Sequence, residues 1–432
     1  MGVLDRLRRI TGEEEQRKKD AADRTGEIKN LRQRVEAVMA RRPPLTTREA
    51  TKYPPLQDLI AGEEITTAQG AFFMAKESRQ SHQLHGNRSV GKLARLNMTA
   101  AALLANNPAI ARCRIAEGLF LDTETTGLSG GTGTLAFMIG VGWFAGDTFV
   151  THQIFVRDFS EERAALQYLT GIVEAKKFLI SFNGKAFDVN LLAARYVLNR
   201  LKNPLENIPH LDLLFPSRRL CGHRLENSRL GTLEQQLFGL YRDDDLPGME
   251  ITGRYFEWLR RRDPRLVLDI FKHNRLDILS LAALAVHLAE LIGPCPDASS
   301  SPPQDLLAAA RLLQNRREDA SAKDILDSLA ACDHVAVRGE AQRLLSLTLK
   351  KQGDSAKAAR LWEGMLREDP ADRFAAVELA KWYEHGCRNY QAAHDLVAQA
   401  LARTPPLQGK ERAALRKRLL RLQARLRSPV SE

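Results

Sequence analysis

Short apolar runs predict a series of buried strands in the middle of the chain. They are rich in β-branched and aromatic residues and span residues 115–121, 136–144, 149–156, 178–182 and 208–215. The turn Ala145-Gly146-Asp147 separates the second run from the third. The first three runs follow one another with no helical pattern between them.

Helical patterns lie between and after the later strands. They cover residues 161–176 and 189–201, and a last one runs from about 266 to 291. Three consecutive strands followed by alternating helices and strands predict an α/β sheet with an antiparallel part and a parallel part. A short strand pair is expected earlier, around Ile65 to Met74.

A stretch rich in proline and serine predicts a linker near residue 300. Beyond it the chain is helical, and two similar segments end at Pro370 and Pro405, about one tetratricopeptide period apart. We therefore expect a charged N-terminal segment (helical or partly disordered), an irregular α+β lead-in, an α/β domain, the linker and a tetratricopeptide-like helical domain with a basic C-terminal helix. Their boundaries are 1–45, 46–113, 114–292, 293–304 and 305–432.

The charge balance favours a polyanionic partner. The 432 residues include 64 lysines and arginines against 53 aspartates and glutamates, a net charge of +11. A basic surface that is merely solvated is the alternative explanation. The five cysteines form no Cys-x-x-Cys pair, so neither a zinc ribbon nor a disulfide framework is predicted. No signal-like or membrane-spanning apolar stretch occurs, so a cytoplasmic protein without membrane contact is expected.

Two carboxylates end the first predicted strand. Asp122 and Glu124 are two positions apart, so their side chains leave a strand on the same face. Ionised carboxylates at this separation repel each other, and a hard divalent cation such as Mg²⁺ or Mn²⁺ removes that penalty. Surface Asp-x-Glu triplets are common, but this one follows a buried strand. The position therefore favours a metal site.

Two later segments add further candidate ligands. Asp188 follows a glycine turn and falls in the first turn of a predicted helix, where an aspartate can also act simply by stabilising the helix N-terminus. His273 and Asp277 are one helical turn apart and share a face. Histidine can transfer a proton near neutral pH, although such a pair taken alone is more often structural.

Together these segments resemble, in order, the three motifs of the DEDD exonuclease superfamily within residues 114–292. They read Asp-Thr-Glu-Thr-Thr-Gly-Leu from Asp122, Asn-Gly-Lys-Ala-Phe-Asp from Asn183 and His-Asn-Arg-Leu-Asp from His273. More closely, the chain resembles the YprB-type ribonuclease-H-like family, which bacteria often join to tetratricopeptide repeats. Segments 210–214, 230–234 and 246–248 also look like that family's pattern. The resemblance implies an α/β ribonuclease-H-like domain with a mixed sheet flanked by helices.

The resemblance also implies a mechanism with two Mg²⁺ or Mn²⁺ ions. Asp122 would bridge both ions, Glu124 and Asp277 would bind one, and Asp188 would help hold the other. His273 would take or position the proton of the attacking water. Superfamily members with a catalytic histidine usually have four residues between it and the last aspartate, whereas here there are three. The candidate substrate contacts are Thr125, Asn183 and Lys185.

The leading hypothesis is a 3′→5′ exonuclease that acts on single-stranded DNA or RNA, with helical repeats that recruit a protein partner or grip nucleic acid. A non-catalytic nucleic-acid-binding adaptor is the main alternative, but a scaffold has no need to tolerate four mutually repelling carboxylates. A structure-specific endonuclease would keep the chemistry and change the substrate. The preference between DNA and RNA depends on contacts to the 2′-hydroxyl, and the sequence leaves it open.

Overall fold

The computed structural model describes residues 53–127, 133–242, 246–293, 301–402 and 409–427. The charged N-terminal segment predicted over residues 1–45 and most of the predicted linker 293–304 lie outside them. The described residues form two compact units. The first runs to Ala289 apart from Arg219–His223, and the second contains Arg219–His223 and continues from Glu290.

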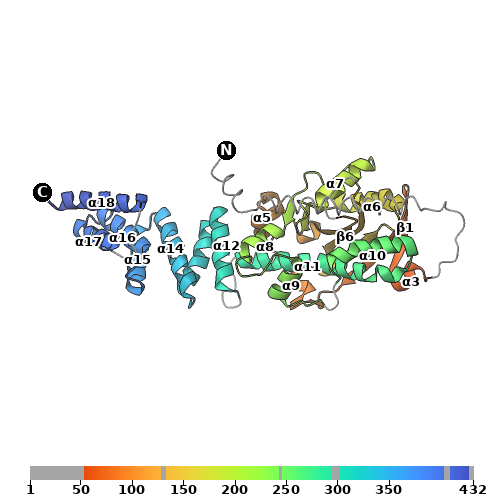
Figure 1. The fold of residues 1–432 in the computed structure, drawn as a ribbon, viewed down its shortest axis with the longest axis horizontal. Helices are drawn as coiled ribbons and strands as arrows, with labels where there is room; N and C mark the ends of the chain where they lie inside the picture. The colour runs from red at the N-terminus through yellow and green to blue at the C-terminus, as the bar shows by residue number, and fades with distance from the viewer. Residues whose placement is uncertain (1–52, 128–132, 243–245, 294–300, 403–408, 428–432) are drawn as a thin grey trace, which may run out of the picture. The chain divides into compact units, whose positions relative to one another are not determined.

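A seven-stranded sheet is the centre of the first unit (Figure 1). Its order is β1-β2-β7-β6-β5-β8-β9, antiparallel from β1 to β5 and parallel from β5 to β9. The predicted combination of an antiparallel and a parallel part is confirmed. The strands, in sheet order, are Gly62–Thr67, Gly70–Arg79, Thr148–Phe155, Ala136–Ala145, Gly118–Thr125, Phe178–Ser181 and His210–Asp212.

The lead-in over residues 46–113 contributes to this sheet. The predicted strand pair is present as β1 and β2, and β2 pairs with β7. Two short strands, β3 (Leu84–His85) and β4 (Arg88–Ser89), form a separate ribbon. The other described elements of this region are α3 (Leu56–Leu59), α4 (Val90–Leu93), α5 (Met98–Ala105) and η1 (Pro108–Arg112), and η2 (Ile115–Glu117) lies between it and β5. The sheet therefore begins well before residue 114.

Helices cover both faces of the sheet (Figure 1). One face receives α6 (Glu162–Glu174) and α7 (Asp188–Leu198), and the short η3 (Phe159–Glu161) precedes α6. The opposite face receives α11 (Leu268–Ile292), which follows η4 (Pro264–Leu266). Close approach of α11 depends on two glycines of β6, because a Cβ at Gly140 or Gly142 would lie 2.3 Å or 2.6 Å from side-chain atoms of the helix.

The strand predicted over residues 208–215 is shorter than expected. It ends at Asp212, and Leu214 already begins α8 (Leu214–Leu220). The physical reason is local: the Asp212 carboxylate accepts a hydrogen bond from the Leu214 backbone N–H at 3.1 Å, an Asx turn that leads from the strand into the helix. The apolar pattern alone could not distinguish the end of the strand from the start of the helix, because both are buried.

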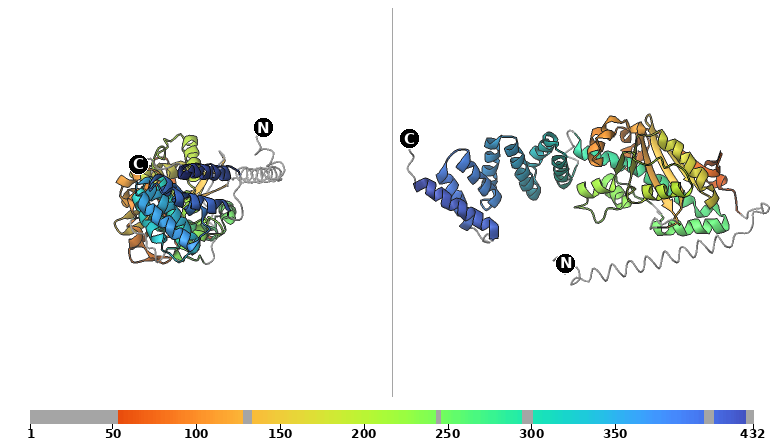
Figure 2. Two further views of the ribbon diagram at one scale, coloured as in Figure 1. Left: turned by 90° about the vertical axis from the view of Figure 1, so that its left-hand side faces the viewer. Right: turned by 90° about the horizontal axis from the view of Figure 1, so that it is seen from above.

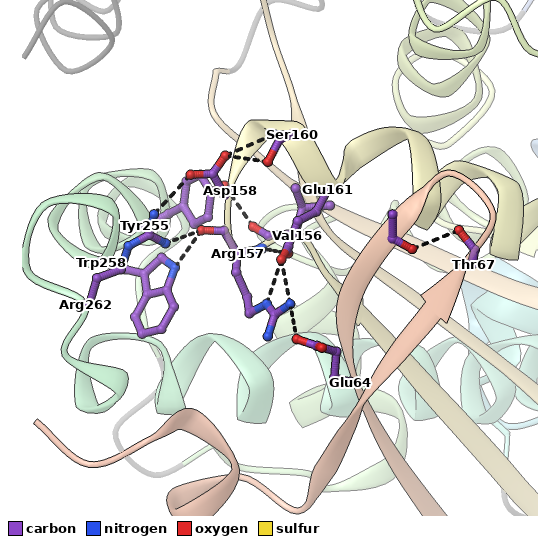
Figure 3. A network of polar contacts seen from close by, with 11 residues as sticks. Glu64, Thr67, Val156, Arg157, Asp158, Ser160, Glu161, Tyr255, Trp258 and Arg262 are labelled. Carbon is purple, nitrogen blue, oxygen red and sulfur yellow. Dashed lines mark hydrogen bonds and ion pairs between the residues drawn. The ribbon is translucent and has the colours of Figure 1, made fainter. Parts of the chain in front are cut away.

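Helix α10 (Gly248–Arg261) follows α9 (Leu230–Phe238) and is fixed at the end of β7 (Figure 3). The Tyr255 hydroxyl donates to the Val156 carbonyl at 2.9 Å, and the Trp258 indole donates to the Arg157 carbonyl at 3.2 Å. Arg262, just beyond the helix, also donates to the Arg157 carbonyl, at 2.5 Å. These bonds satisfy main-chain carbonyls at a strand end and hold α10 in a defined place.

The second unit is helical and consists mainly of α12 to α18 among the described residues, each packed against the next (Figures 1 and 2). Aspartates cap several of these helices; Asp354 and Asp372 accept backbone N–H groups at the starts of α15 and α16. The predicted all-helical C-terminal part is confirmed. The helices are Pro303–Asn315, Asp319–Leu329, Val335–Lys351, Ser355–Glu368, Arg373–His385, Tyr390–Ala402 and Gly409–Arg427.

Among the described helices, none is both long enough and apolar enough to cross a membrane.

Candidate metal centre

Strand β5 lies inside the sheet and carries Asp122 and Glu124. Both side chains leave the strand on the face that α11 covers, since Asp122 is opposite Gly140 of β6 and Gly140 contacts the helix. The pairing with β6 shifts by one residue between Glu124 and Thr125, so the regular ladder is interrupted immediately after the two carboxylates. A strand end beneath a helix places both carboxylates in a largely buried position.

Helix α11 brings His273 and Asp277 to these carboxylates. His273 Nε2 is 3.5 Å from Asp277 Oδ2 and 4.0 Å from Glu124 Oε1. One ligand atom from each of Glu124, His273 and Asp277 lies within 4.8 Å of the other two. Two carboxylates and an imidazole are a donor set that divalent cations accept, so this cluster can hold a metal ion.

Asp122 stands beside the cluster and is tied to α11 directly. The Asn274 side-chain amide donates a hydrogen bond to Asp122 Oδ2 at 3.0 Å. Asn274 is fully buried, so this bond is shielded from water. Helix α11 therefore carries Asp277 itself, brings His273 close to Glu124 and bonds Asn274 to Asp122.

Asp188 approaches β5 from the other side. Its Oδ1 accepts the Thr123 hydroxyl at 2.5 Å, and Thr123 alternates with Asp122 and Glu124 and so belongs to the opposite face. The turn before Asp188 is held by Asp212, which accepts the backbone N–H groups of Asn183 and Lys185 at 2.8 Å and 3.0 Å. Asp212 therefore holds the turn from β8 into α7, in which a Cβ at Gly184 would lie 2.3 Å from Ser181 Oγ.

The predicted substrate contacts differ in how their side chains are engaged. The Thr125 hydroxyl donates to the Gly127 carbonyl at 2.8 Å, and the Thr125 carbonyl accepts the Thr252 hydroxyl from α10 at 2.8 Å. Asn183 and Lys185 have exposed side chains at the turn that precedes Asp188. Their contact with a substrate stays a prediction.

A buried arginine that the sequence analysis did not single out touches the cluster. Arg242 forms an ion pair with Asp277 and a second one with Glu234. Its side chain is 7 % exposed and that of Glu234 is 0 % exposed. The only sequence signal was a glutamate in segment 230–234, among apolar helix positions. Nothing local predicted that Arg242 would reach it and Asp277 together.

Comparisons with known proteins show which family this chain belongs to. Residues 119–289 match a family model described as the RNase_H superfamily. Over 314 residues the chain is 32% identical to a protein of Bacillus subtilis (strain 168) described as "Uncharacterized protein YprB", covering 72% of this chain and 75% of that protein. This chain belongs to the YprB family. That description names no activity, so the function has to be argued from the site.

The family-like segments 210–214 and 230–234 contact groups next to the candidate metal ligands. His210 Nε2 is 2.7 Å from the hydroxyl of Ser181, the last residue of β8, and Asp212 holds the turn before Asp188. Glu234 holds Arg242 against Asp277. In this YprB-family protein both segments therefore support the carboxylates through other groups.

Burial and mutual repulsion shift the carboxyl groups strongly. Burial, and then the charges of Asp277, Glu124 and Asp188, raise the pKa of Asp122 well above its usual range. Burial raises the pKa of Glu124 to about 7, although His273 acts in the opposite direction. Burial raises the pKa of Asp188 to about 6, against the hydrogen bond from Thr123. A cation bound among these carboxyl groups would favour their ionised forms and lower these pKa values.

Metal affinity is expected to fall at least about tenfold when the pH is lowered from about 7.5 to about 5.5. Glu124 ionises near pH 7 in the metal-free folded protein, and a proton there competes with a metal ion. The unfolded chain loses this proton near its ordinary pKa of 4.5, so the folded state holds more protons between the two values. The metal-free protein should therefore lose stability as the pH rises through this window.

Calorimetric titration with Mn²⁺ at both pH values checks the affinity, and thermal unfolding in EDTA checks the stability. In Glu124→Gln the part of the stability change that Glu124 causes should disappear. An Mn²⁺ affinity that is the same at both pH values would contradict the assignment of these carboxylates as ligands.

Proposed function

We propose that this YprB-family protein is a metal-dependent nuclease of the DEDD type, a 3′→5′ exonuclease that acts on single-stranded DNA or RNA. The observation that carries the proposal is the grouping of Glu124, His273 and Asp277 within 4.8 Å, beside Asp122, on an RNase_H superfamily domain. Arg242 offsets part of the repulsion between these carboxylates at Asp277, and a divalent cation held by the carboxylates would offset the repulsion that remains.

Glu124 and Asp277 would hold one ion, and Asp122 would contribute to holding both. Asp188, whose charge raises the pKa of Asp122, would help hold the second. The donor set is mainly oxygen, which favours Mg²⁺ or Mn²⁺. A bound pair of such ions supplies Lewis-acid polarisation of the phosphodiester and lowers the pKa of an attacking water. The chain's part is to fix the carboxylates at this spacing within a largely buried site.

His273 is proposed to take or position the proton of the attacking water. Its Nε2 faces the carboxylates of Asp277 and Glu124 at 3.5 Å and 4.0 Å, so the imidazole is held at the edge of the cluster. Proton transfer by a positioned histidine needs this proximity to the reacting groups. His273 and Asp277 are four positions apart, about one helical turn, which brings both side chains to the same face of α11.

The net charge, two exposed side chains and the helical unit bear on what the protein binds. A net charge of +11 suits a polyanionic substrate, since phosphate contacts supply much of the affinity of nucleic-acid-binding proteins. The exposed side chains of Asn183 and Lys185 are the proposed contacts to it. The helical unit is proposed, on its weak tetratricopeptide-like period, to recruit a protein partner or to grip nucleic acid.

Stepwise shortening of end-labelled single strands from the 3′ end is the expected result when the purified protein is given Mn²⁺ or Mg²⁺. Linear and circular substrates of DNA and of RNA are compared on sequencing gels, with EDTA as the control. Cleavage of circles would instead indicate an endonuclease. Binding of nucleic acid with no metal-dependent cleavage of any substrate would overturn the proposal in favour of an adaptor.

A further inference from the structure

A chain of buried amide groups leads from the middle of the sheet to Asp122. Gln153 of β7 donates through Nε2 to the Phe271 carbonyl at 2.8 Å and to Asn274 Oδ1 at 3.0 Å. Asn274 in turn donates through Nδ2 to Asp122 Oδ2 at 3.0 Å. Gln153 is 3 % exposed and Asn274 is 0 % exposed. Every bond of the chain is therefore protected from water.

The chain has a fixed direction. The Phe271 main-chain carbonyl can only accept, so it selects the amide nitrogen of Gln153 as the group that faces it. That nitrogen then selects the oxygen of Asn274, which leaves the Asn274 nitrogen facing Asp122. The result is a donor held against one carboxylate oxygen, Oδ2, with the other oxygen left out of this bond.

The sheet leaves room for this arrangement. Asp122 pairs with Gly140, and Gly140 pairs with Gln153, so the three residues are neighbours across β5, β6 and β7. A Cβ at Gly140 would lie 2.3 Å from Asn274 Oδ1 and 2.6 Å from Nδ2. No side chain other than hydrogen fits there unless Asn274 moves, so glycine makes the space in which the amide lies.

We propose that Asn274 is a positioning residue that orients Asp122 for metal binding, and that Gln153 sets the orientation of Asn274. The inference rests on the proposed metal site. Hydrogen bonds from buried neighbours commonly orient metal ligands, and their loss typically lowers affinity about 10- to 100-fold. Asn274 lies beside His273 in the sequence but acts through Asp122, so it does not itself touch substrate.

The test compares the full-length wild type with Asn274→Leu, which has a similar volume and no donor. Asn199→Leu is the matched control, because Asn199 also donates an amide hydrogen bond to a buried carboxylate, Glu162 Oε2 at 2.9 Å, away from the metal centre. Calorimetric titration with Mn²⁺ is expected to show an affinity about 10- to 100-fold weaker for Asn274→Leu and unchanged for Asn199→Leu. With nucleic acid at saturating metal, kcat should fall more than KM rises.

Gln153→Met provides a second variant in case Asn274→Leu does not fold, since it keeps Asn274 and removes the amide that donates to Asn274 and to the Phe271 carbonyl. We expect its Mn²⁺ affinity to fall about tenfold. Wild-type affinity in a folded Asn274→Leu or Gln153→Met would overturn the inference and leave the metal site standing. A wild type that takes up no Mn²⁺ would overturn the proposed function and the inference with it.

Discussion

Metal-dependent cleavage is expected to fall at least about 1,000-fold in Asp122→Asn, a loss of about 4 kcal/mol of transition-state stabilisation. Asparagine has the same shape as aspartate, and its side-chain oxygen can still accept the hydrogen bond from Asn274. It carries no negative charge and is a much poorer ligand for Mg²⁺ or Mn²⁺. The loss should therefore appear in kcat while the fold stays intact.

Thermal unfolding separates this effect from a folding defect. Without metal, Asp122→Asn should unfold at the same temperature as the wild type or higher, because the substitution removes a buried carboxyl group that its neighbours repel. The stabilisation that Mn²⁺ gives the wild type should shrink in the variant. Asp147→Asn, in the exposed turn after β6, is the control and should keep full activity. Undiminished cleavage by Asp122→Asn would refute the nuclease assignment.

Arg242→Met is expected to lower the free energy of unfolding of the first unit by about 3–5 kcal/mol. Arg242 is the cation between Glu234 and Asp277, and Glu234 is completely buried. Methionine preserves much of the volume of arginine but has no positive charge. The Glu234 carboxylate therefore loses its ion pair with residue 242. Burial already raises the pKa of Glu234, and Arg242 acts to lower it, so the variant must either bury an unpaired charge or take up a proton.

Arg254→Met is the matched control for this prediction. Arg254 pairs with Asp269 at 2.5 Å, but both side chains are substantially exposed, and such surface pairs contribute about 0–1 kcal/mol. Differential scanning calorimetry of the full chain measures both variants, with the unfolding of the two units analysed as separate transitions. Equal, small effects of the two substitutions would mean that Arg242 does not hold this part of the molecule together.

The sheet of this protein was predictable to the extent that burial follows the local pattern. The apolar runs located β5, β6, β7 and β8 to within a few residues because these strands are buried along most of their length. The same rule failed at residues 208–215, where a buried strand passes directly into a buried helix. An apolar run indicates that a segment is buried, but it does not indicate whether the backbone is a strand or a helix.

The candidate site was predictable where a local rule applies. Alternation along a strand put Asp122 and Glu124 on one face, and the spacing of one helical turn put His273 beside Asp277. The position of Asp188 relative to these groups could not be predicted from local spacing. Its carboxylate reaches β5 through Thr123, which belongs to the opposite face of the strand.

The sequence by itself determined most of the order of strands and helices between residues 115 and 292 and the local pairs of candidate ligands, because both depend on residues a few positions apart. Only the tertiary structure decided that Gln153, Asn274 and Asp122 form one chain of hydrogen bonds, and that Arg242 joins Glu234 to Asp277. The partners in these contacts are between 8 and 152 positions apart. Polar groups of this kind find partners only when the elements pack, and burial then requires that each be satisfied.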